Sequence, residues 1–457
     1  MAIVLPFQGT LYQMEAVGDI DQVVAPPYDV ISPQEQELYY QRSPFNIIRL
    51  ILGTPSAGDR ETCNRYTRAA DYLRSWVQQG VLRVDPDPAF YLYRQIYTLE
   101  GERRVRRGFI GRIRLEDYDQ GAVLPHEKTL PAPKADRLAL LRACRANLSP
   151  IFGLYSDPAR EVSSLMQEVE ARGEEPPGSG VELRFQLKDD RGVEHTLWSL
   201  SQKERVEEMA AAMRARQILI ADGHHRYETA LEYRREMRRL LPASSGEEPF
   251  DYTMIYLANL DDEGISILST HRLVRHLPDR GPDSLSSLLE RVEEHFRVES
   301  LPLTPGTGEE VRQACALLEA IVPTGGAGLH LFGLYAGGDC FYRLILKGEA
   351  LPPALLREGI PEVWRTLDVV ILHRLLLEQG VGLTPEEIQG QCLGYTQDAA
   401  QAIRSVRSGA YQLAFLVNPT RIEEVRRVAT SGARMPEKST YFYPKLLSGL
   451  VLRQFEA

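Results

Sequence analysis

One short segment constrains the fold of this chain more than any other, because it joins an apolar strand directly to a helix. Residues Ile218–Ala221 form a run of buried-type side chains, and Asp222-Gly223 follows as a tight turn. Glycine permits a left-handed backbone and lets the main chain approach a ligand closely. A helical pattern over 225–240 begins directly after the turn. The segment therefore predicts a strand, a turn and a helix in immediate succession.

The start of this predicted helix carries an unusual set of side chains. The first amide N–H groups of a helix lack partners within the helix, and the helix dipole favours an anion beside them. His224, His225 and Arg226 nevertheless add cationic or donor groups at the same end. Cations here oppose the dipole, and a bound phosphate would neutralise both. The structural alternative is that Asp222 is an N-cap and the histidines face solvent.

A second cluster lies in Pro125–Thr129 and continues with Lys134–Arg137. The prolines around it stiffen the loop, which lowers the entropic cost of holding charged groups together. Glu127 or Asp136 is expected to serve as a general base, and Lys134 or Arg137 as a phosphate clamp. His126 and Thr129 add a further donor and a hydroxyl group. The structural alternative is a solvated charged loop in front of a helix, and spacing alone does not place this loop beside the histidine turn.

Three weaker signals stand elsewhere in the chain. Asp29, in the stiff segment Ala25-Pro26-Pro27-Tyr28-Asp29, either faces a pocket or caps the residues that follow. His271 and Arg272 follow a strand and repeat the His-Arg pairing, so they are candidate phosphate-binding residues. Lys438-Ser439-Thr440 together with Lys445 either binds an anion or docks the C-terminal segment.

Metal binding is conceivable through His126, His224, His225 and Asp222, but the chain has no HxxxH or HxH spacing. A tightly held transition metal is therefore disfavoured, and Mg²⁺ on Asp222, accompanying a phosphate compound, is the expected ion. His373 lies on an apolar helix and is expected to be a core histidine. Asp368, about one helical turn earlier, is its predicted partner.

Composition excludes several classes of protein. The net charge of -10 over 457 residues argues against a broad nucleic-acid-binding surface. The five cysteines, at positions 63, 144, 315, 340 and 392, are widely separated, as in a reducing cytoplasm. The chain has no run of about 18 apolar residues that would predict a membrane span. The sequence thus favours a cytoplasmic protein without a membrane or nucleic-acid partner, and leaves a homodimer open.

The pattern of elements predicts an α+β fold in which most strands pair as hairpins. Helices are expected over 60–80, 134–146, 201–214 and 364–379, and hairpins over 89–115 and 329–346. The loop-type residues Arg172–Gly180 separate an N-terminal α+β region, 1–175, from a central region, 176–300, with the histidine turn. A C-terminal α+β region would comprise 301–457.

The motifs together resemble one known family over nearly the whole chain. They are APPYDVIS, LPHEKTL with PK-DR, ADGHHRYETA, THRLV and MPEKSTYFYPKLLSGL. This combination resembles the bacterial domain-of-unknown-function family numbered 1015, whose name supplies no reaction. The ADGHHRYETA segment is also similar to the signature turn of the ParB/sulfiredoxin-like superfamily, which includes free serine kinases.

The second resemblance implies a ParB/sulfiredoxin-like phosphate-binding core. Gly223, His225 and Arg226 would then hold phosphate, and Asp222 would act near the transferred phosphoryl group. His224 replaces the catalytic cysteine of sulfiredoxins, which speaks against their redox chemistry and leaves His224 as a catalytic candidate. No catalytic glutamate of the serine kinases aligns, so Glu127 is the candidate on chemistry alone.

The expected function is a small-molecule phosphotransferase, a kinase acting on a free amino acid such as L-serine. ATP, ADP or pyrophosphate would be the phosphoryl donor, since phosphoryl transfer needs mainly positioning and charge neutralisation. Glu127 or Asp222 would take the proton of the acceptor hydroxyl. A phosphoserine phosphatase or nucleotide hydrolase would use the same groups with water as acceptor. A nucleotide-binding regulatory module without turnover is the alternative from another class.

Overall fold

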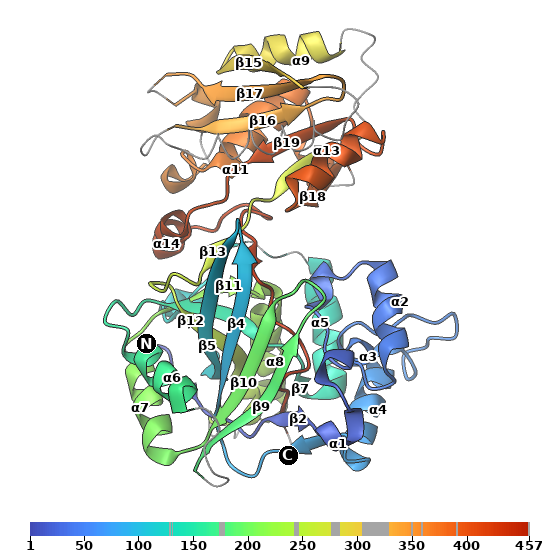
Figure 1. Cartoon of the computed structure of the whole chain (residues 1–457), viewed down its shortest axis with the longest axis vertical. Helices are drawn as coiled ribbons and strands as arrows, with labels where there is room; N and C mark the ends of the chain where they lie inside the picture. Colours follow the sequence, from blue (N-terminus) through green and yellow to red (C-terminus); the bar gives the residue numbers. More distant parts are fainter. Residues whose placement is uncertain are drawn as a thin grey trace. The chain divides into compact units, whose positions relative to one another are not determined.

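A computed structural model describes most of the chain, namely residues 1–127, 129, 131–172, 179–241, 246–275, 284–303, 329–348, 351–357, 360–389 and 392–455. The chain forms two compact units (Figure 1). Unit 1 comprises Met1–Ser266 and Pro444–Ala457, and unit 2 comprises Ile267–Tyr443. Unit 2 is thus an insertion between two parts of unit 1. Both units combine helices with sheets, so the α+β class predicted from the sequence is confirmed.

A mixed sheet forms the centre of unit 1. Its strand order is β6-β11-β8-β12-β5-β4-β10-β9, and β1 pairs with β5 outside this path. The predicted hairpin is confirmed, with β4 and β5 joined at Glu100-Gly101, where both residues have positive φ. The strands are β1 (Val4–Leu5), β4 (Phe90–Leu99), β5 (Glu102–Arg114), β6 (Val123–Leu124), β8 (Ile151–Tyr155), β9 (Val181–Lys188), β10 (Glu194–Leu200), β11 (Ile218–Asp222) and β12 (Tyr252–Asn259).

Helices cover both sides of this sheet. In Figure 1, α6 and α7 lie on one side of it, and α5 lies on the other with α2, α3 and α4. The central helix α8 begins directly after β11 and packs along α5. The helices of unit 1 are α1 (Met14–Val17), α2 (Pro33–Arg42), α3 (Ile48–Ile51), α4 (Arg65–Gln78), α5 (Pro131–Cys144), α6 (Glu161–Arg172), α7 (Lys203–Met213) and α8 (His224–Leu240).

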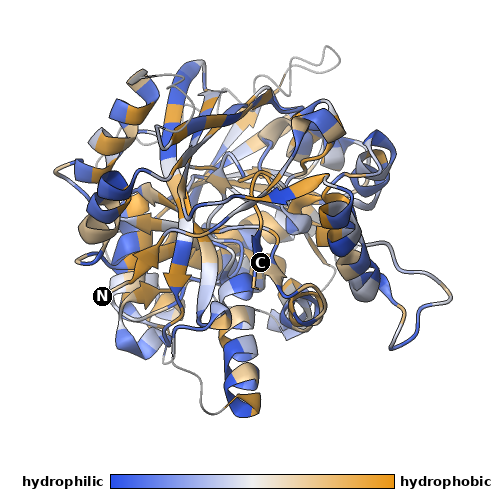
Figure 2. Cartoon of the chain, turned by 90° about the horizontal axis from the view of Figure 1, so that it is seen from below, coloured by the Kyte–Doolittle hydropathy of each residue, from blue (hydrophilic) through white to orange (hydrophobic). Residues whose placement is uncertain are grey.

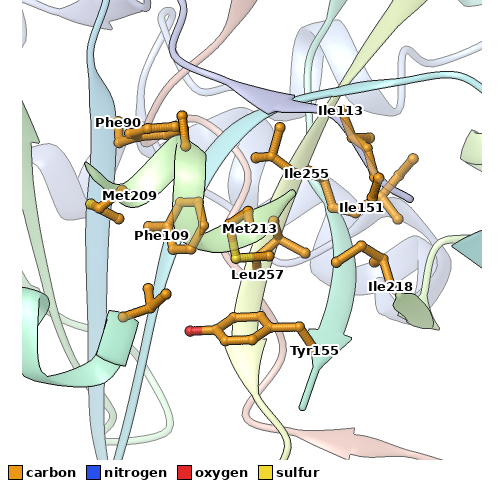
Figure 3. Packing of buried hydrophobic residues seen from close by; sticks show 14 of the residues in the cluster. Phe90, Phe109, Ile113, Ile151, Tyr155, Met209, Met213, Ile218, Ile255 and Leu257 are labelled. Carbon is orange, nitrogen blue, oxygen red and sulfur yellow. The ribbon is translucent and has the colours of Figure 1, made fainter. Parts of the chain in front are cut away.

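The main hydrophobic core of unit 1 lies between the sheet and its helices. Phe90, Phe109 and Ile255 from the strands meet Met209 and Met213 of α7, and their side chains point toward one another in Figure 3. Strand side chains alternate between the two faces of a sheet, so one apolar set can face these helices. Tyr227 joins the same core from the first turn of α8. The start of α8 is therefore anchored in the core.

The C-terminal residues return to unit 1 and run across it. We call Pro444–Phe455 the C-terminal strap. Its Ser448 exchanges backbone hydrogen bonds with Ala25, and its Leu452 does so with Thr10. Arg453, 3% exposed, donates to the side chain of Asn147 and to a backbone carbonyl of β12. Two small ribbons complete this region: β2 (Thr10–Tyr12) with β3 (Leu82–Val84), and β7 (Ala146–Asn147) with β21 (Arg453–Gln454).

Unit 2 has a sheet of its own, with antiparallel pairing in the order β15-β17-β16-β19-β14-β18. Its core joins this sheet to α13 through side chains such as Phe341, Ile403 and Leu416. The strands are β14 (His271–Val274), β15 (Phe296–Pro302), β16 (Leu331–Tyr335), β17 (Cys340–Leu346), β18 (Leu393–Thr396) and β19 (Leu413–Val417), while β13 (Ser266–Ile267) pairs with β20 (Phe442–Tyr443). The helices are α9 (Ser284–Glu293), α11 (Asp368–Ile371) continuing as a π-helix over Leu372–Val381, α12 (Pro385–Gln389), α13 (Ala399–Arg407) and α14 (Ile422–Thr430).

The two units differ from the three regions expected from the sequence. The expected boundary at 175 falls inside unit 1, because β9 pairs with β10, and β10 pairs with β4 of the N-terminal hairpin. Most of the expected linker, residues 173–178, lies outside the described residues. The expected C-terminal region is divided as well, since the strap belongs to unit 1.

The predicted pairing of His373 with Asp368 is wrong. The Asp368 carboxylate instead contacts Nδ1 of His330 at 2.6 Å. Nε2 of His373 is buried without a hydrogen-bond partner among the described residues, and burial lowers the pKa of His373 to about 3. The helix between the two residues changes from α to π geometry after Ile371, so sequence spacing did not give the contact.

The outer helices carry hydrophilic residues interspersed with hydrophobic ones, whereas hydrophobic colour dominates many of the strands (Figure 2). This pattern suits helices that cover a sheet with one face only. Among the described residues, no helix combines the length and the apolar character that a membrane crossing requires.

The anchoring of α8 can be tested with Tyr227→Phe. The Tyr227 hydroxyl donates to the Glu116 carbonyl at 2.8 Å and accepts from the Glu116 N–H at 3.1 Å. Losing both hydrogen bonds should lower the free energy of unfolding by about 1–3 kcal/mol. Tyr155→Phe is the matched control, because its buried hydroxyl has no hydrogen-bond partner among the described residues. Urea unfolding that shows equal losses for the two variants would contradict this anchoring role.

Candidate functional site

The predicted strand, turn and helix are present at the centre of unit 1. β11 ends at Asp222, Gly223 occupies the N-cap position, and α8 begins at His224. Gly223 has a φ of 91°, and a Cβ atom there would lie 2.9 Å from the Arg226 guanidinium. The left-handed backbone favours glycine at this position, and a Cβ atom there would also displace the Arg226 guanidinium. The first turn of α8 has no acidic residue, and its N-cap residue makes no side-chain hydrogen bond.

Strand pairing brings the loop around His126 to this turn. β6 runs parallel to β11, with Val123 opposite Ile218 and Leu124 opposite Leu219. Parallel neighbours end at the same edge of a sheet, so the residues that follow each strand meet there. The backbone N–H of His126 donates to Nε2 of His224 at 3.3 Å, and the two imidazole rings lie edge to face at 4.7 Å. The two predicted clusters therefore lie next to each other in unit 1.

The two contacting histidines are held in defined protonation states. His126 is fully buried, and its Nδ1 contacts the Ile220 carbonyl at 2.7 Å. Burial lowers the pKa of His126 to about 4, although the Ile220 carbonyl and Asp222 both favour the charged form. His126 is thus neutral at pH 7, with its proton on Nδ1. Because Nε2 of His224 accepts a hydrogen bond, that nitrogen carries no proton in this arrangement.

Two cations face the Asp222 carboxylate. Its Oδ2 lies 3.1 Å from Nζ of Lys445 and 3.9 Å from the Arg226 guanidinium, while its Oδ1 accepts from the Gly223 N–H at 2.9 Å. Burial alone would raise the pKa of Asp222, but Lys445 and Arg226 outweigh it and hold this pKa well below its usual range. Asp222 is therefore ionised at neutral pH. Lys445 reaches it from the C-terminal strap.

Glu228 links the second cluster to α8. Thr129 donates its hydroxyl hydrogen to Oε2 of Glu228 at 2.6 Å, and Nζ of Lys134 lies 3.1 Å from the same oxygen. Glu228 is one helical turn after His224, so it presents its carboxylate near the start of α8. Glu127 is half-buried in the loop between His126 and Thr129.

The other charged pair of the second cluster connects three elements. Asp136 accepts hydrogen bonds from Arg65 and Tyr66 of α4 and from Arg137. Burial raises the pKa of Asp136, but Arg137 and Tyr66 lower it by more. The pKa of Asp136 is therefore below its ordinary value. Through its hydrogen bonds with Arg65 and Tyr66, the Asp136 carboxylate connects α5 to α4. Arg137 also donates to the Ile51 carbonyl at 2.7 Å.

A small pocket adjoins the start of α8. It has a volume of about 60 Å³, and its polar lining comes from Tyr28, Arg137, Asn147, Ser149, Arg226, Thr229 and Thr253. Arg137 stacks on the Tyr28 ring, with its guanidinium carbon 3.9 Å from the ring centre. The Thr229 hydroxyl is buried without a hydrogen-bond partner among the described residues. Two guanidinium groups and an unsatisfied hydroxyl suit a small anionic or polar ligand.

Arg226 connects the pocket to the turn, because it belongs to both. Arg226 lines the pocket, donates to the Pro150 carbonyl and faces Asp222. Burial raises the pKa of Tyr28 to about 12, and the charges of Asp29, Arg137, Arg226 and Asp222 also act on it. Tyr28 is the residue of the segment Ala25–Asp29 that lines the pocket. Asp29 is exposed.

His271 and Arg272 belong to unit 2, where both are engaged in its sheet. Nδ1 of His271 accepts from the Val417 N–H at 3.2 Å, and Arg272 donates to the carbonyls of Thr270 and Lys438. Both side chains are buried, and burial lowers the pKa of His271 to about 4. Both side chains therefore contact the backbone of unit 2 itself.

Three residues of the site were not among those predicted for it. Glu228 lies one turn beyond the histidines, which is a signal that helical spacing supplies. Tyr28 belongs to the stiff segment in which the sequence pattern predicts Asp29, and not Tyr28, as the candidate for a pocket. Lys445 was noted as an anion-binding or docking residue, but its contact with Asp222 spans more than two hundred positions and leaves no local signal.

The described residues do not assemble a metal site from protein groups alone. No three His, Cys, Asp or Glu side chains gather within reach of one ion in the part of the chain that the structure describes. Mg²⁺ commonly takes one or two carboxylates together with substrate phosphates. Asp222 offers one carboxylate, and Lys445 already contacts its Oδ2. A resident Mg²⁺ therefore does not fit this set of donors.

The ion pairs of Asp222 predict a pH-dependent effect of Asp222→Asn. The side chains of Lys445 and Asp222 are 13% and 21% exposed, so losing the charge should lower the free energy of unfolding by about 1–3 kcal/mol at pH 7. The folded pKa is below the unfolded value of about 3.9, so this contribution is present above pH 4 and lost as the pH falls below it. Urea unfolding at pH 7, 4 and 3 measures it.

Asp119→Asn is the matched control, because Asp119 is an exposed aspartate in the turn before β6. It should leave the free energy of unfolding nearly unchanged. A constant difference between wild type and Asp222→Asn from pH 7 to pH 3 would contradict the ion pair.

His126 predicts a second pH effect in a different window. Its folded pKa of about 4 lies below the unfolded value of about 6.5, so between these pH values the unfolded chain binds more protons. The free energy of unfolding should therefore fall with decreasing pH by up to about 1.4 kcal/mol per pH unit. His126→Asn retains a donor toward Ile220 and removes this contribution. Equal slopes for both proteins between pH 6.5 and pH 4 would refute it.

Comparison with protein families gives one match, over residues 4–370, to the family described as "Protein of unknown function (DUF1015)". A search of curated proteins finds no match. Similar solved structures include a free serine kinase mutant in complex with AMP, with 12% identity, a TM-score of 0.32 and coverage of 70% of this chain and 84% of that chain. At TM-scores this low, such likenesses do not bear on the function of this chain.

Two further solved structures are similar at the same level. A conserved hypothetical protein from Pyrococcus furiosus has 13% identity and a TM-score of 0.30, with coverage of 71% of this chain and 89% of that chain. SbnI with a C-terminal truncation from Staphylococcus aureus has 13% identity and a TM-score of 0.29, with coverage of 73% and 84%. The family match extends over most of the chain, and the protein therefore belongs to the family described as "Protein of unknown function (DUF1015)".

Proposed function

We propose that unit 1 binds a phosphate compound at the start of α8 and transfers a phosphoryl group to a small-molecule acceptor. One observation carries this proposal: Arg226 and Lys445 converge on the single carboxylate of Asp222 beside a glycine-capped helix start. Two cations against one carboxylate leave positive charge where the helix dipole is also positive. An anion such as phosphate balances that charge and accepts from the first amide N–H groups.

The binding roles follow from the positions of the side chains. Arg226 would contact the phosphate with its guanidinium group, and Lys445 would add a point charge. Gly223 would keep the turn open to the ligand, and His225 would add a donor from the first turn. Lys134 pairs with Glu228, one helical turn after the start of α8, and this ion pair keeps Lys134 directed toward α8.

Glu127 is the general base in this proposal, and Asp222 orients the two cations. A general base works best when its pKa is near the working pH, and the pKa of Asp222 lies well below its usual range. His224 contacts the backbone next to Glu127 and would fix that loop against the reacting groups. The proton of the acceptor hydroxyl would pass to Glu127 as the hydroxyl oxygen bonds to phosphorus. The bond from phosphorus to the bridging oxygen of the donor would break, and the rest of the donor (ADP from ATP, AMP from ADP, phosphate from pyrophosphate) would leave with that electron pair.

A free amino acid such as L-serine is the acceptor that we propose to test first. The segment Asp222–Tyr227 resembles the turn of the free serine kinases, and the pocket beside it offers Arg137 and Arg226 to an anionic group. ATP, ADP and pyrophosphate are the donors to compare. With water as acceptor, the same groups would make the protein a phosphatase or a nucleotide hydrolase.

A nucleotide-binding module without turnover is a second candidate, and the closed ion pair of Asp222 with Lys445 favours it. A carboxylate already neutralised in this way is suited to holding cations in place for binding. In that case Glu127 would have only a structural role in its loop. Binding without transfer or release of phosphate would then be the observed behaviour.

Two variants separate binding from turnover. Arg226→Gln should weaken binding of the phosphate donor at least about tenfold, since it removes a charge-assisted contact. Glu127→Gln should leave donor affinity nearly unchanged and lower kcat by about 10²–10⁴-fold. Calorimetry with ATP, ADP and pyrophosphate measures affinity. Phosphorus NMR with L-serine and Mg²⁺ present measures transfer.

Arg234→Gln is the matched control for the affinity measurement, because Arg234 lies two turns further along α8 and pairs with Asp117. It should bind donors like the wild type. Wild-type binding without any phosphate transfer or release would favour the regulatory module. Absence of binding to all three phosphate compounds would overturn both candidates.

A further inference from the structure

The backbone of the C-terminal strap is fixed at the residue that reaches Asp222. Gln95 of β4 donates from Nε2 to the Lys445 carbonyl at 3.0 Å. Arg106 of β5 donates from its guanidinium group to the Pro444 carbonyl. Two consecutive carbonyls are thus held by side chains from two neighbouring strands, immediately beside the lysine whose Nζ lies 3.1 Å from the Asp222 carboxylate.

Gln95 and Arg106 form a buried pair. They lie directly opposite each other in the β4–β5 ladder, and Arg106 donates through Nε to Oε1 of Gln95 at 3.0 Å. Gln95 is 0% exposed and Arg106 is 1% exposed. Buried polar groups of this kind are costly unless they are satisfied. Here both side chains also donate to carbonyls of the strap, Gln95 to that of Lys445 and Arg106 to that of Pro444.

Aromatic rings hold the Arg106 guanidinium in place. Its central carbon lies 4.8 Å from the ring centre of Phe152 and 5.8 Å from that of Tyr256. Phe152 of β8 is also the residue paired with Asp222 of β11. Phe152 thus supports both sides of the ion pair between Asp222 and Lys445: its backbone pairs with Asp222, and its ring packs against Arg106, which holds the strap next to Lys445.

We propose that Gln95 and Arg106 are positioning residues that hold Lys445 at the phosphate site. This inference rests on the proposed function for its effect on phosphate binding. A lysine side chain is long and flexible, so its charge is placed reliably only when its backbone is fixed. Gln95 and Arg106 do not touch the ligand themselves, and they act through Lys445. Lys445 lies beyond residues 4–370, which carry the family match.

A ligand-free measurement tests the positioning by itself. Gln95→Glu keeps an acceptor for Arg106 but removes the donor to the Lys445 carbonyl. Urea midpoints are compared for Gln95→Glu, Asp222→Asn and the double variant. We expect a double variant less destabilised than the sum of the two shifts, because both changes weaken one ion pair. Additive shifts would overturn the positioning role, whatever the protein binds.

Pyrophosphate affinity tests the link to the site. Lys445→Met should weaken binding at least about tenfold and Gln95→Glu about fivefold, as expected for loss and misplacement of one charge-assisted contact. The variant that combines both should bind no more weakly than Lys445→Met alone. Further weakening in the combined variant would show that Gln95 acts through general destabilisation and would overturn the inference.

Two controls complete the experiment. Gln217→Glu makes the same chemical change at the opposite end of β11, where Gln217 donates to the Gly121 carbonyl, and should leave affinity unchanged. Gln95→Met, which also lacks the donor, replaces Gln95→Glu if that variant does not fold. A wild type that binds no pyrophosphate would count against the proposed function, while the ligand-free cycle would still decide the positioning role.

Discussion

The parallel pairing of β6 with β11 is the constraint on which the site depends. Two short strands end side by side, so the loop after one strand contacts the helix start after the other. This pairing involves only two residue pairs, yet it sets the position of His126, Thr129 and Lys134 relative to α8. The rest of the sheet holds β11 from the other side through β8. A shift of β6 by one residue would reverse which side chains face the turn.

A single carboxylate organises the charges at this turn. Asp222 comes from the end of β11, Arg226 from the first turn of α8, and Lys445 from the C-terminal strap. Two cations repel each other unless an anion lies between them, and Asp222 supplies that anion within unit 1. Beside these charges, burial keeps His126 neutral at pH 7, and Nε2 of His224 accepts a hydrogen bond from the His126 backbone N–H.

The sequence predicted the parts of this structure that depend on neighbouring residues. The hairpin turn at Glu100-Gly101 and the succession of β11, Gly223 and α8 follow from local backbone preferences. The residue types at the site were also predictable, since helix starts favour anions. The sequence could not show that Lys445 meets Asp222, because that contact depends on how unit 2 is inserted. The partner of Asp368 was missed for a similar reason, since His330 lies on a separate segment.

The insertion of unit 2 also has a consequence for biosynthesis. A chain grows from its N-terminus, and domains generally fold as their residues emerge from the ribosome. Every strand of the large sheet is synthesised before unit 2, but Lys445 follows only after unit 2 is complete. Until then, Gln95 and Arg106 cannot make their hydrogen bonds to the carbonyls of Lys445 and Pro444. The order of translation thus delays completion of the site until the whole insertion has been made.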